Sequence, residues 1–172
     1  EIAKRIIDSL DLVKINFYNI LELGVNENKV SEYLIEKTNK CSFLQTDISN
    51  KRIYNNKDLN FLELDLDNWK LNKNEYDLIY SSHSLEHVND ITKYVKLFSD
   101  KLRKGGVIFF EVPNCEKSVE IISPHTYYFT KNFFNTLNFN IQLLETFHYK
   151  SGISSEIVKN NNGDVIRFIG SK

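Results

Sequence analysis

The chain has 172 residues, of which 41% are hydrophobic and 26% are charged, and its formal net charge is -1. This length and composition suit one globular domain over residues 1–172 with a sizeable hydrophobic core. The charges of both signs are interspersed, which gives no bulk attraction to polyanions, so we expect no nucleic-acid partner. No apolar run approaches the roughly 20 residues that a membrane-spanning helix needs.

The two cysteines, Cys41 and Cys115, are too few for a disulfide scaffold and lack a metal-ligand spacing such as C-x-x-C. We therefore expect free thiols in a reducing cytoplasm and no metal site. The chain begins at Glu1 and has no methionine. We expect its natural start, and with it further N-terminal sequence, to lie upstream.

Amphipathic segments and short apolar runs alternate in the first half of the chain. Residues 3–14 carry apolar side chains at helical spacing, whereas residues 17–24 form an apolar run closed by Gly24, which suits a buried strand. The predicted elements of this half are a helix over 3–14, strands over 17–24, 41–47 and 59–66, a helix over 29–37, a weak helix or turn over 48–56, and a polar loop over 68–75.

The second half continues the alternation and closes with two strands. Residues 88–106 have the clearest helical pattern, with Asn89 as a candidate N-cap and Gly105 as the stop. The other predicted elements are strands over 76–84, 107–114, 139–150 and 164–172, and a helix over 129–137 with Thr130 as its N-cap.

This order of elements predicts an α/β fold. Strands that alternate with helices imply parallel βαβ units and a doubly wound, Rossmann-like sheet of seven mostly parallel strands. The last two strands are separated only by an Asn-rich polar loop around Gly163. We expect them to form an antiparallel C-terminal hairpin at one edge of the sheet.

The residues at the ends of the predicted strands are the candidates for a functional site. In open α/β sheets, ligands bind outside the carboxyl ends of the strands, where the strand order reverses. The polar and small residues at these ends are Glu22, Gly24, Asn26, Asn28, Asp47, Asp65, Ser81, Ser82, His83, Glu111, Pro113 and Asn114.

Five segments in this order resemble the motifs of class I S-adenosylmethionine-dependent methyltransferases. The closest resemblance is to a small-molecule branch that includes the ubiquinone-biosynthesis type O-methyltransferases. The segments are NILELGVNENKVSEYL (19–34), QTDIS (45–49), EYDLIYSSHSLEHVND (75–90), LRKGGVIFFEVPN (102–114) and SPHTYYFTKNFFNTL (123–137). The resemblance covers nearly the whole chain. It implies methyl transfer from S-adenosylmethionine to a small-molecule acceptor, with oxygen as the expected acceptor atom.

The resemblance also assigns the cofactor-binding residues. Gly24 would let the backbone approach the cofactor, because it has no Cβ, and Glu22 would sit near the cofactor's amino-acid end. Asp47 would accept hydrogen bonds from the ribose diol, and Asp65 from the adenine amino group, with Leu66 packed on the adenine. The structural alternatives are an exposed strand charge for Glu22, a helix N-cap for Asp47 and a turn residue for Asp65.

Asn26 and Asn28 stand where such loops usually carry further glycines. Asparagine is the non-glycine residue that best tolerates left-handed backbone geometry, so the loop need not be lost. Their side chains would nevertheless occupy space near the methionine moiety. The sequence therefore leaves open whether this loop binds the cofactor or has lost it.

The end of the fourth strand is where the transferred methyl group is expected, which places Ser82 and His83 beside the cofactor. His83 is the candidate catalytic base, because the ordinary pKa of histidine suits proton transfer near neutrality. The alternative is a cofactor-shelf residue with no proton role. Residues expected on the substrate side are His87, Glu111, Asn114, His125 and Tyr127. For His87 and His125 the alternative is a structural role.

The sequence is compatible with three functions. The first is an active small-molecule methyltransferase. The second is a catalytically silent methyltransferase-like module that binds a partner protein, which the substituted loop after Gly24 motivates. The third is a nucleotide- or NAD-binding enzyme, which would require a G-x-G-x-x-G pattern where this chain has only Gly24.

Overall fold

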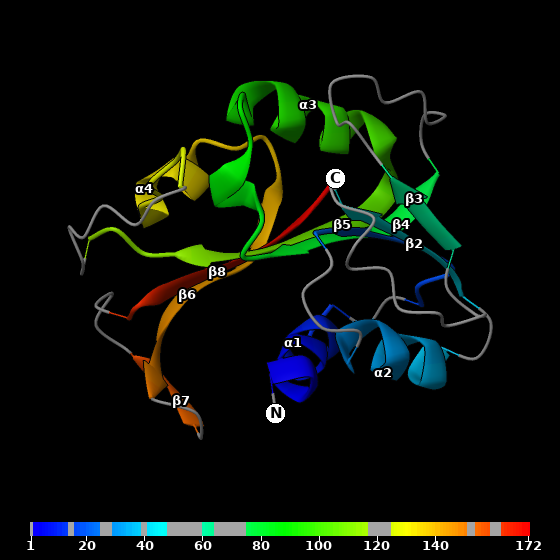
Figure 1. Cartoon of the computed structure of the whole chain (residues 1–172), viewed down its shortest axis with the longest axis horizontal. Helices are drawn as coiled ribbons and strands as arrows, with labels where there is room; N and C mark the ends of the chain where they lie inside the picture. The colour runs from blue at the N-terminus through cyan, green and yellow to red at the C-terminus, as the bar shows by residue number, and fades with distance from the viewer. Residues whose placement is uncertain are drawn as a thin grey trace.

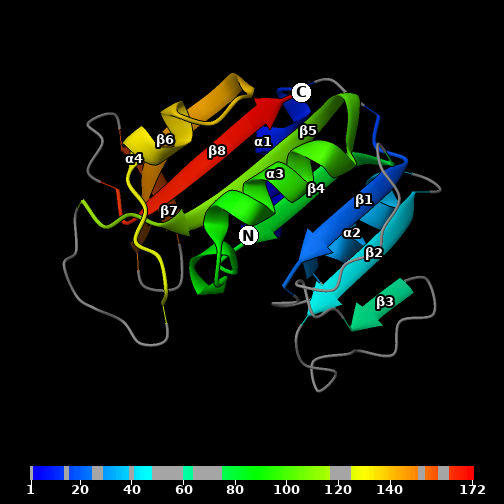
Figure 2. The same cartoon turned by 90° about the horizontal axis from the view of Figure 1, so that it is seen from above.

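In the computed structural model, the described residues are 2–13, 16–24, 29–38, 41–47, 60–63, 75–116, 125–150, 154–158 and 163–172. Within these ranges eight strands form one sheet, in the order β3-β2-β1-β4-β5-β8-β6-β7, and Figure 2 shows them side by side. The strands are β1 (Asn19–Leu23), β2 (Ser42–Asp47), β3 (Asn60–Glu63), β4 (Tyr76–Ser82), β5 (Leu102–Pro113), β6 (Asn140–Lys150), β7 (Ser154–Val158) and β8 (Val165–Ser171).

The first five strands are parallel, and the C-terminal strands are antiparallel. β1 pairs in parallel with β2 and β4, β2 with β3, and β4 with β5. β8 lies antiparallel between β5 and β6, which confirms the predicted C-terminal hairpin. The predicted strand number of seven is one too low, because β7 adds an antiparallel partner to β6 alone. Its polar sequence, SSEIV, lies in a segment predicted as loop and carries little apolar signal.

Helices cover both faces of the sheet. They are α1 (Ile2–Asp11), α2 (Lys29–Thr38), α3 (Ile91–Lys101) and α4 (Lys131–Asn135), with a short 3₁₀ helix η3 (Leu85–His87) after β4. α1 and α2 lie on one side of the sheet and α3 on the other (Figure 1). No helix in the described ranges combines the length and apolar character needed to cross a membrane.

Alternation along the strands divides the core between these two faces. Ile20 and Phe109 point toward α1 and α2, where Ile6, Leu10 and Leu34 are buried with them. Their strand neighbours point the other way. The buried cluster under α3 contains Leu21, Ile79, Phe98, Phe110 and Phe168. Each strand of the centre is therefore apolar on both faces, as expected for a doubly wound sheet.

Two predicted helix boundaries are wrong at α3. The N-cap is Asp90 rather than Asn89, because the Asp90 side chain accepts a hydrogen bond from the Lys93 amide at 3.0 Å. The helix ends at Lys101 rather than at Gly105, because Leu102 is extended and already belongs to β5. Thr130 is the N-cap of α4, as predicted. The predicted helix or turn over 48–56 lies outside the described residues.

Candidate active site

The strand order reverses between β1 and β4. From β1 the sheet grows through β2 to β3, whereas from β4 it grows in the opposite direction to β5. Leu23 and Ser81 are register partners, so Gly24 and Ser82 lie beside each other just beyond the paired residues. Gly24 and the strand end predicted to face the methyl group therefore meet at the position where such sheets bind ligands.

Gly24 is required at this junction for two independent reasons. Its φ of +77° lies in the left-handed region, which residues other than glycine rarely adopt. A Cβ at this position would also lie 1.9 Å from the Ser84 Oγ and 2.6 Å from the Ser84 Cβ. The Gly24 amide donates a 2.8 Å hydrogen bond to the Thr46 carbonyl, which ties the end of β1 to β2.

Glu22 is buried beneath the junction, on the face that α1 and α2 cover. Only 3% of its surface is exposed, which excludes an exposed strand charge. One carboxylate oxygen accepts a hydrogen bond from the Gln45 side chain at 2.6 Å, and the other accepts from the Tyr80 hydroxyl. Burial raises the pKa of Glu22 to about 7, against the lowering effect of hydrogen bonds from Tyr80, Gln45 and Ser31. A contact between Glu22 and the cofactor stays a prediction.

The remaining predicted cofactor residues are only partly described. Asp47 ends β2 and is the register partner of Glu63, but its side chain lies outside the description. Four further positions are outside the described residues altogether: Asn26, Asn28, Asp65 and Leu66. Their roles stay predictions.

His83 follows the last residue of β4 in a backbone conformation that is rare for histidine. Its φ is +52°, and its amide donates a 2.9 Å hydrogen bond to the Glu111 carbonyl. The imidazole lies between two buried carboxylates: Nδ1 is 3.5 Å from Glu86 Oε1, and Nε2 is 3.9 Å from Glu111 Oε1. Left-handed backbone at a non-glycine residue is concentrated at functional sites.

The two carboxylates also determine the protonation of His83. Burial by itself lowers the pKa of His83, but the hydrogen bond and charge of Glu86 and the charge of Glu111 together raise it above 6.5. Its ring remains 28% exposed. A histidine in this setting can take up a proton from a neighbouring group, because both carboxylates stabilise the cation that results.

Glu111 is held by a buried network of polar side chains that was not predicted from the sequence. Its side chain is fully buried, and the Arg167 Nη2 and Nε donate hydrogen bonds to Glu111 Oε2 at 2.7 and 3.1 Å. The Arg167 Nη1 also donates to Ser9 Oγ of α1 at 3.1 Å and to Glu145 Oε1 of β6 at 3.3 Å. The available signal was a charged residue in the middle of the apolar strand VIRFIG.

Asn114 and Tyr127 are bonded within the fold. Asn114 is 2% exposed, and its amide donates to the Gly163 carbonyl at 2.8 Å and accepts from the Glu116 amide at 3.1 Å. The Tyr127 hydroxyl donates to the Asn89 carbonyl at 3.0 Å. These bonds indicate structural roles, and contact with a substrate stays a prediction for both.

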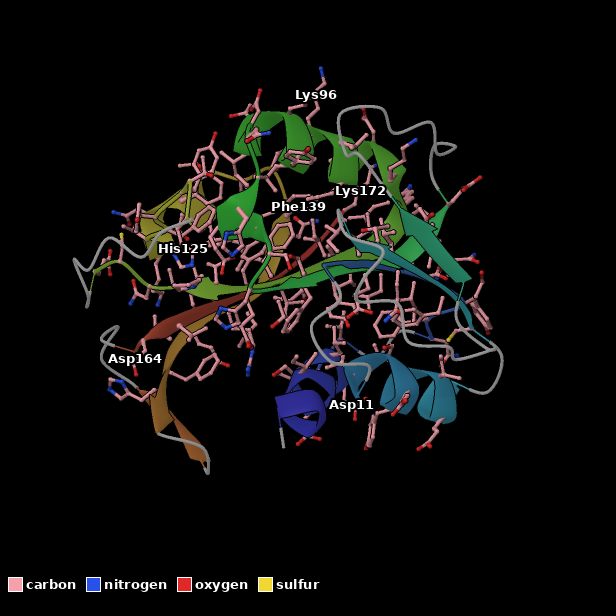
Figure 3. All side chains as sticks on the ribbon, viewed as in Figure 1. Asp11, Lys96, His125, Phe139, Asp164 and Lys172 are labelled. Atoms are coloured by element: carbon pink, nitrogen blue, oxygen red, sulfur yellow. The ribbon has the colours of Figure 1, made fainter. Side chains whose placement is uncertain are left out.

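His87 and His125 are brought together, although they are distant in the sequence. Their rings are 4.9 Å apart between centroids, in an edge-to-face arrangement at 70°. Figure 3 labels His125, which precedes α4. The contact places His125 beside η3, which follows β4. Contact with a substrate stays a prediction for both histidines.

Comparison with known proteins agrees with this geometry. Residues 2–149 match a family model described as a methyltransferase domain. A search of curated proteins found no match.

Three solved structures illustrate the likeness in fold. An S-adenosylmethionine-dependent methyltransferase from Archaeoglobus fulgidus is 17% identical with a TM-score of 0.71, covering 99% of this chain and 93% of that one. An S-adenosylmethionine-dependent methyltransferase from Mesorhizobium loti is 16% identical with a TM-score of 0.69, and 91% of each chain is covered. A complex of the Haloferax volcanii Trm112 methyltransferase activator with a putative methyltransferase matches at 13% identity and a TM-score of 0.73, covering 98% and 92%.

The family match, the reversal of strand order at Gly24 and the resemblance of the motifs agree with one another. The branch within the family stays a prediction. The chain belongs to the S-adenosylmethionine-dependent methyltransferases.

Proposed function

We propose that this methyltransferase methylates an oxygen atom of a small-molecule acceptor, with His83 as the residue that takes the acceptor's proton. The observation that carries the proposal is the placement of His83 at the strand reversal, between Glu86 at 3.5 Å and Glu111 at 3.9 Å. A hydroxyl acceptor must lose a proton when it is methylated, and a histidine beside two carboxylates suits that task.

The residues present at the junction fit the cofactor. Gly24 leaves no Cβ at the end of β1, and its neighbours at the ends of β2 and β4 are Asp47 and Ser82. We propose that Gly24, Asp47, Asp65, Leu66 and Ser82 hold the cofactor. When bound, S-adenosylmethionine supplies an electrophilic methyl group whose bonding electrons remain on sulfur after transfer.

The protein's own contribution is to orient the acceptor and remove its proton. The main-chain bond from His83 to Glu111 and the carboxylates on either side of the ring fix the imidazole. The proton passes from the acceptor hydroxyl to His83, and Glu86 and Glu111 stabilise the imidazolium. We also propose a cytoplasmic location, because Cys41 and Cys115 are free thiols.

The first experiment is titration calorimetry of the purified chain with S-adenosylmethionine and with S-adenosylhomocysteine. We expect micromolar binding that is lost in Asp47→Ala. If a folded chain binds neither compound at millimolar concentration, the enzyme proposal fails, and a catalytically silent module that binds a partner protein takes its place.

The second experiment tests His83 with the substitution His83→Asn. Asparagine tolerates a left-handed backbone, so the change removes the imidazole without adding strain. We expect the methylation rate of hydroxyl acceptors to fall about 10²- to 10⁴-fold, with unchanged affinity for S-adenosylhomocysteine. An unchanged rate would show that His83 has no proton role.

A further inference from the structure

One glutamate and two histidines gather beside the junction. The glutamate is Glu86, whose Oε1 faces His83, and the two histidines take no part in the proton transfer proposed for His83. Glu86 and His87 lie on η3, and His125 lies in the segment before α4. One donor atom from each residue lies within 4.8 Å of the others. Glu86 is buried, His125 is partly buried and His87 is exposed.

The backbone holds these residues together. The amides of Thr126 and Tyr127 both donate hydrogen bonds to the Glu86 carbonyl, at 2.7 and 3.1 Å. The Ile91 amide donates to the Tyr127 hydroxyl at 3.3 Å, which attaches the same segment to the start of α3. The segment that carries His125 is therefore fixed against η3, so the backbone brings the three residues together before any ligand binds.

Glu86 supplies an independent indication of a ligand. Its side chain is 2% exposed, and Oε1 faces His83. The other oxygen, Oε2, is buried and has no hydrogen-bond partner within the described part of the chain. A buried carboxylate oxygen without a partner is unfavourable, and native structures nearly always satisfy such an atom with a hydrogen bond or an ion.

The chemistry of the donors selects the kind of ion. Two imidazoles and one carboxylate are the protein ligands of many zinc sites, and nitrogen ligands suit zinc and its neighbours in the first transition row. Magnesium and calcium prefer oxygen ligands throughout. Ligand atoms about 2.1 Å from a tetrahedral zinc ion are about 3.4 Å from one another. Donor atoms that are up to 4.8 Å apart would therefore have to move closer together when zinc binds. Rotation of the exposed His87 side chain can supply that movement.

We propose that Glu86, His87 and His125 bind one divalent transition-metal ion, with zinc as the reference case and one coordination position left open. Sequence spacing predicted no metal site, because the fold alone brings His125 to the neighbouring Glu86 and His87. The proposal concerns metal binding and does not depend on methyl transfer.

The test is zinc titration of the tag-free, metal-stripped chain without S-adenosylmethionine, followed by calorimetry and by thermal unfolding. We expect one zinc ion per chain with micromolar or tighter affinity, and a higher melting temperature with zinc than without. Affinity should fall by at least about tenfold in His87→Ala and in His125→Ala. Cobalt should report the nitrogen ligands through its visible absorption, and magnesium in excess should not displace zinc.

The matched control is His148→Ala, which removes the β6 histidine that pairs with Asp164 and does not belong to the cluster of Glu86, His87 and His125. Its zinc affinity should equal that of the original chain. His87 is exposed, so its loss leaves folding intact even if His125→Ala does not fold. Absent zinc binding, equal affinity in His87→Ala, or displacement by magnesium would each overturn the proposal. Since no cofactor is added, failure here is separate from failure of the methyltransferase assay.

Discussion

Glu22 in the β1 half of the sheet and Glu111 in the β5 half are both buried carboxylates, and they are stabilised differently. Glu22 on β1 accepts hydrogen bonds from neutral side chains, the Gln45 amide and the Tyr80 hydroxyl. Glu111 on β5 instead receives two hydrogen bonds from the Arg167 guanidinium. Both point to the face covered by α1 and α2, so the difference comes from their partners.

This difference has physical consequences. Without a cation nearby, a buried carboxylate takes up a proton at higher pH, and the pKa of Glu22 is raised to about 7, mainly by burial. The stability that a buried ion pair gives to the fold is lost when either partner is removed, because the other charge is then left buried and unpaired. The β1 half should therefore respond to pH, whereas the β5 half should respond to the loss of a single side chain.

The largest effect is expected from breaking the ion pair with Arg167→Met. The substitution leaves Glu111 buried without its cation and also removes bonds to Ser9 and Glu145. Loss of one partner from a buried pair costs about 3–5 kcal/mol, and we expect the free energy of unfolding, measured with urea, to fall by that amount. The double variant Arg167→Met with Glu111→Gln should recover much of the loss.

The matched control for this prediction is the partly exposed pair of His148 and Asp164, whose side chains are 29% and 38% exposed. Asp164→Asn should lower the free energy of unfolding by less than about 1 kcal/mol, because exposed pairs contribute little. Equal losses in Arg167→Met and Asp164→Asn would contradict the assignment of Arg167 as the partner that stabilises Glu111.

The next effect is a pH dependence that comes from Glu22. Its pKa is about 7 in the folded chain and 4.5 at its ordinary value, so the folded chain binds the proton more tightly. Stability from this group is fully present below pH 4.5 and is lost as the pH rises through 7. At about 1.4 kcal/mol per pKa unit, the loss is about 3 kcal/mol.

Glu22→Gln tests this dependence, because glutamine imitates the protonated carboxyl group. Urea unfolding of both chains from pH 4 to pH 8 gives the difference in stability at each pH. We expect the free energy of unfolding of Glu22→Gln to increase relative to that of the original chain as the pH rises from 4.5 to 7. A constant difference over this range would show that Glu22 does not titrate there.

The same comparison shows what sequence can and cannot reveal. The position of Gly24 and His83 at neighbouring strand ends could be predicted, because each lies at the end of a predicted strand and strand ends converge in any doubly wound sheet. Local patterns determine such positions. Arg167 was missed because its partners come from Glu111, Ser9 and Glu145. No periodicity links residues so far apart, and only the folded sheet places them together.

The errors at α3 and β7 have a related cause. Asn89 and Asp90 are both good N-cap residues, and the choice depends on which one can accept from the Lys93 amide. β7 is a strand only because β6 offers it an edge. The cofactor residues Asn26, Asn28, Asp65 and Leu66 stay predictions, since they lie outside the described part of the chain.

The smallest of these effects concerns Gly24, which directly follows β1 where the strand order reverses. Gly24→Ala should lower the free energy of unfolding by about 2–3 kcal/mol, because strained φ adds to the contact with Ser84. Gly105→Ala is the control for φ alone: its φ is +76°, but nothing lies within 4 Å of its Cβ position. Gly105→Ala should lower the free energy of unfolding by only about 1–2 kcal/mol.

The second substitution Ser84→Gly separates the two causes at Gly24. It removes the side-chain atoms that the new Cβ would meet, so Gly24→Ala should cost no more in this background than Gly105→Ala does in the original chain. Urea unfolding of the four chains gives the coupling energy directly. Zero coupling would mean that Ser84 does not constrain position 24, and the glycine would then be explained by backbone geometry alone.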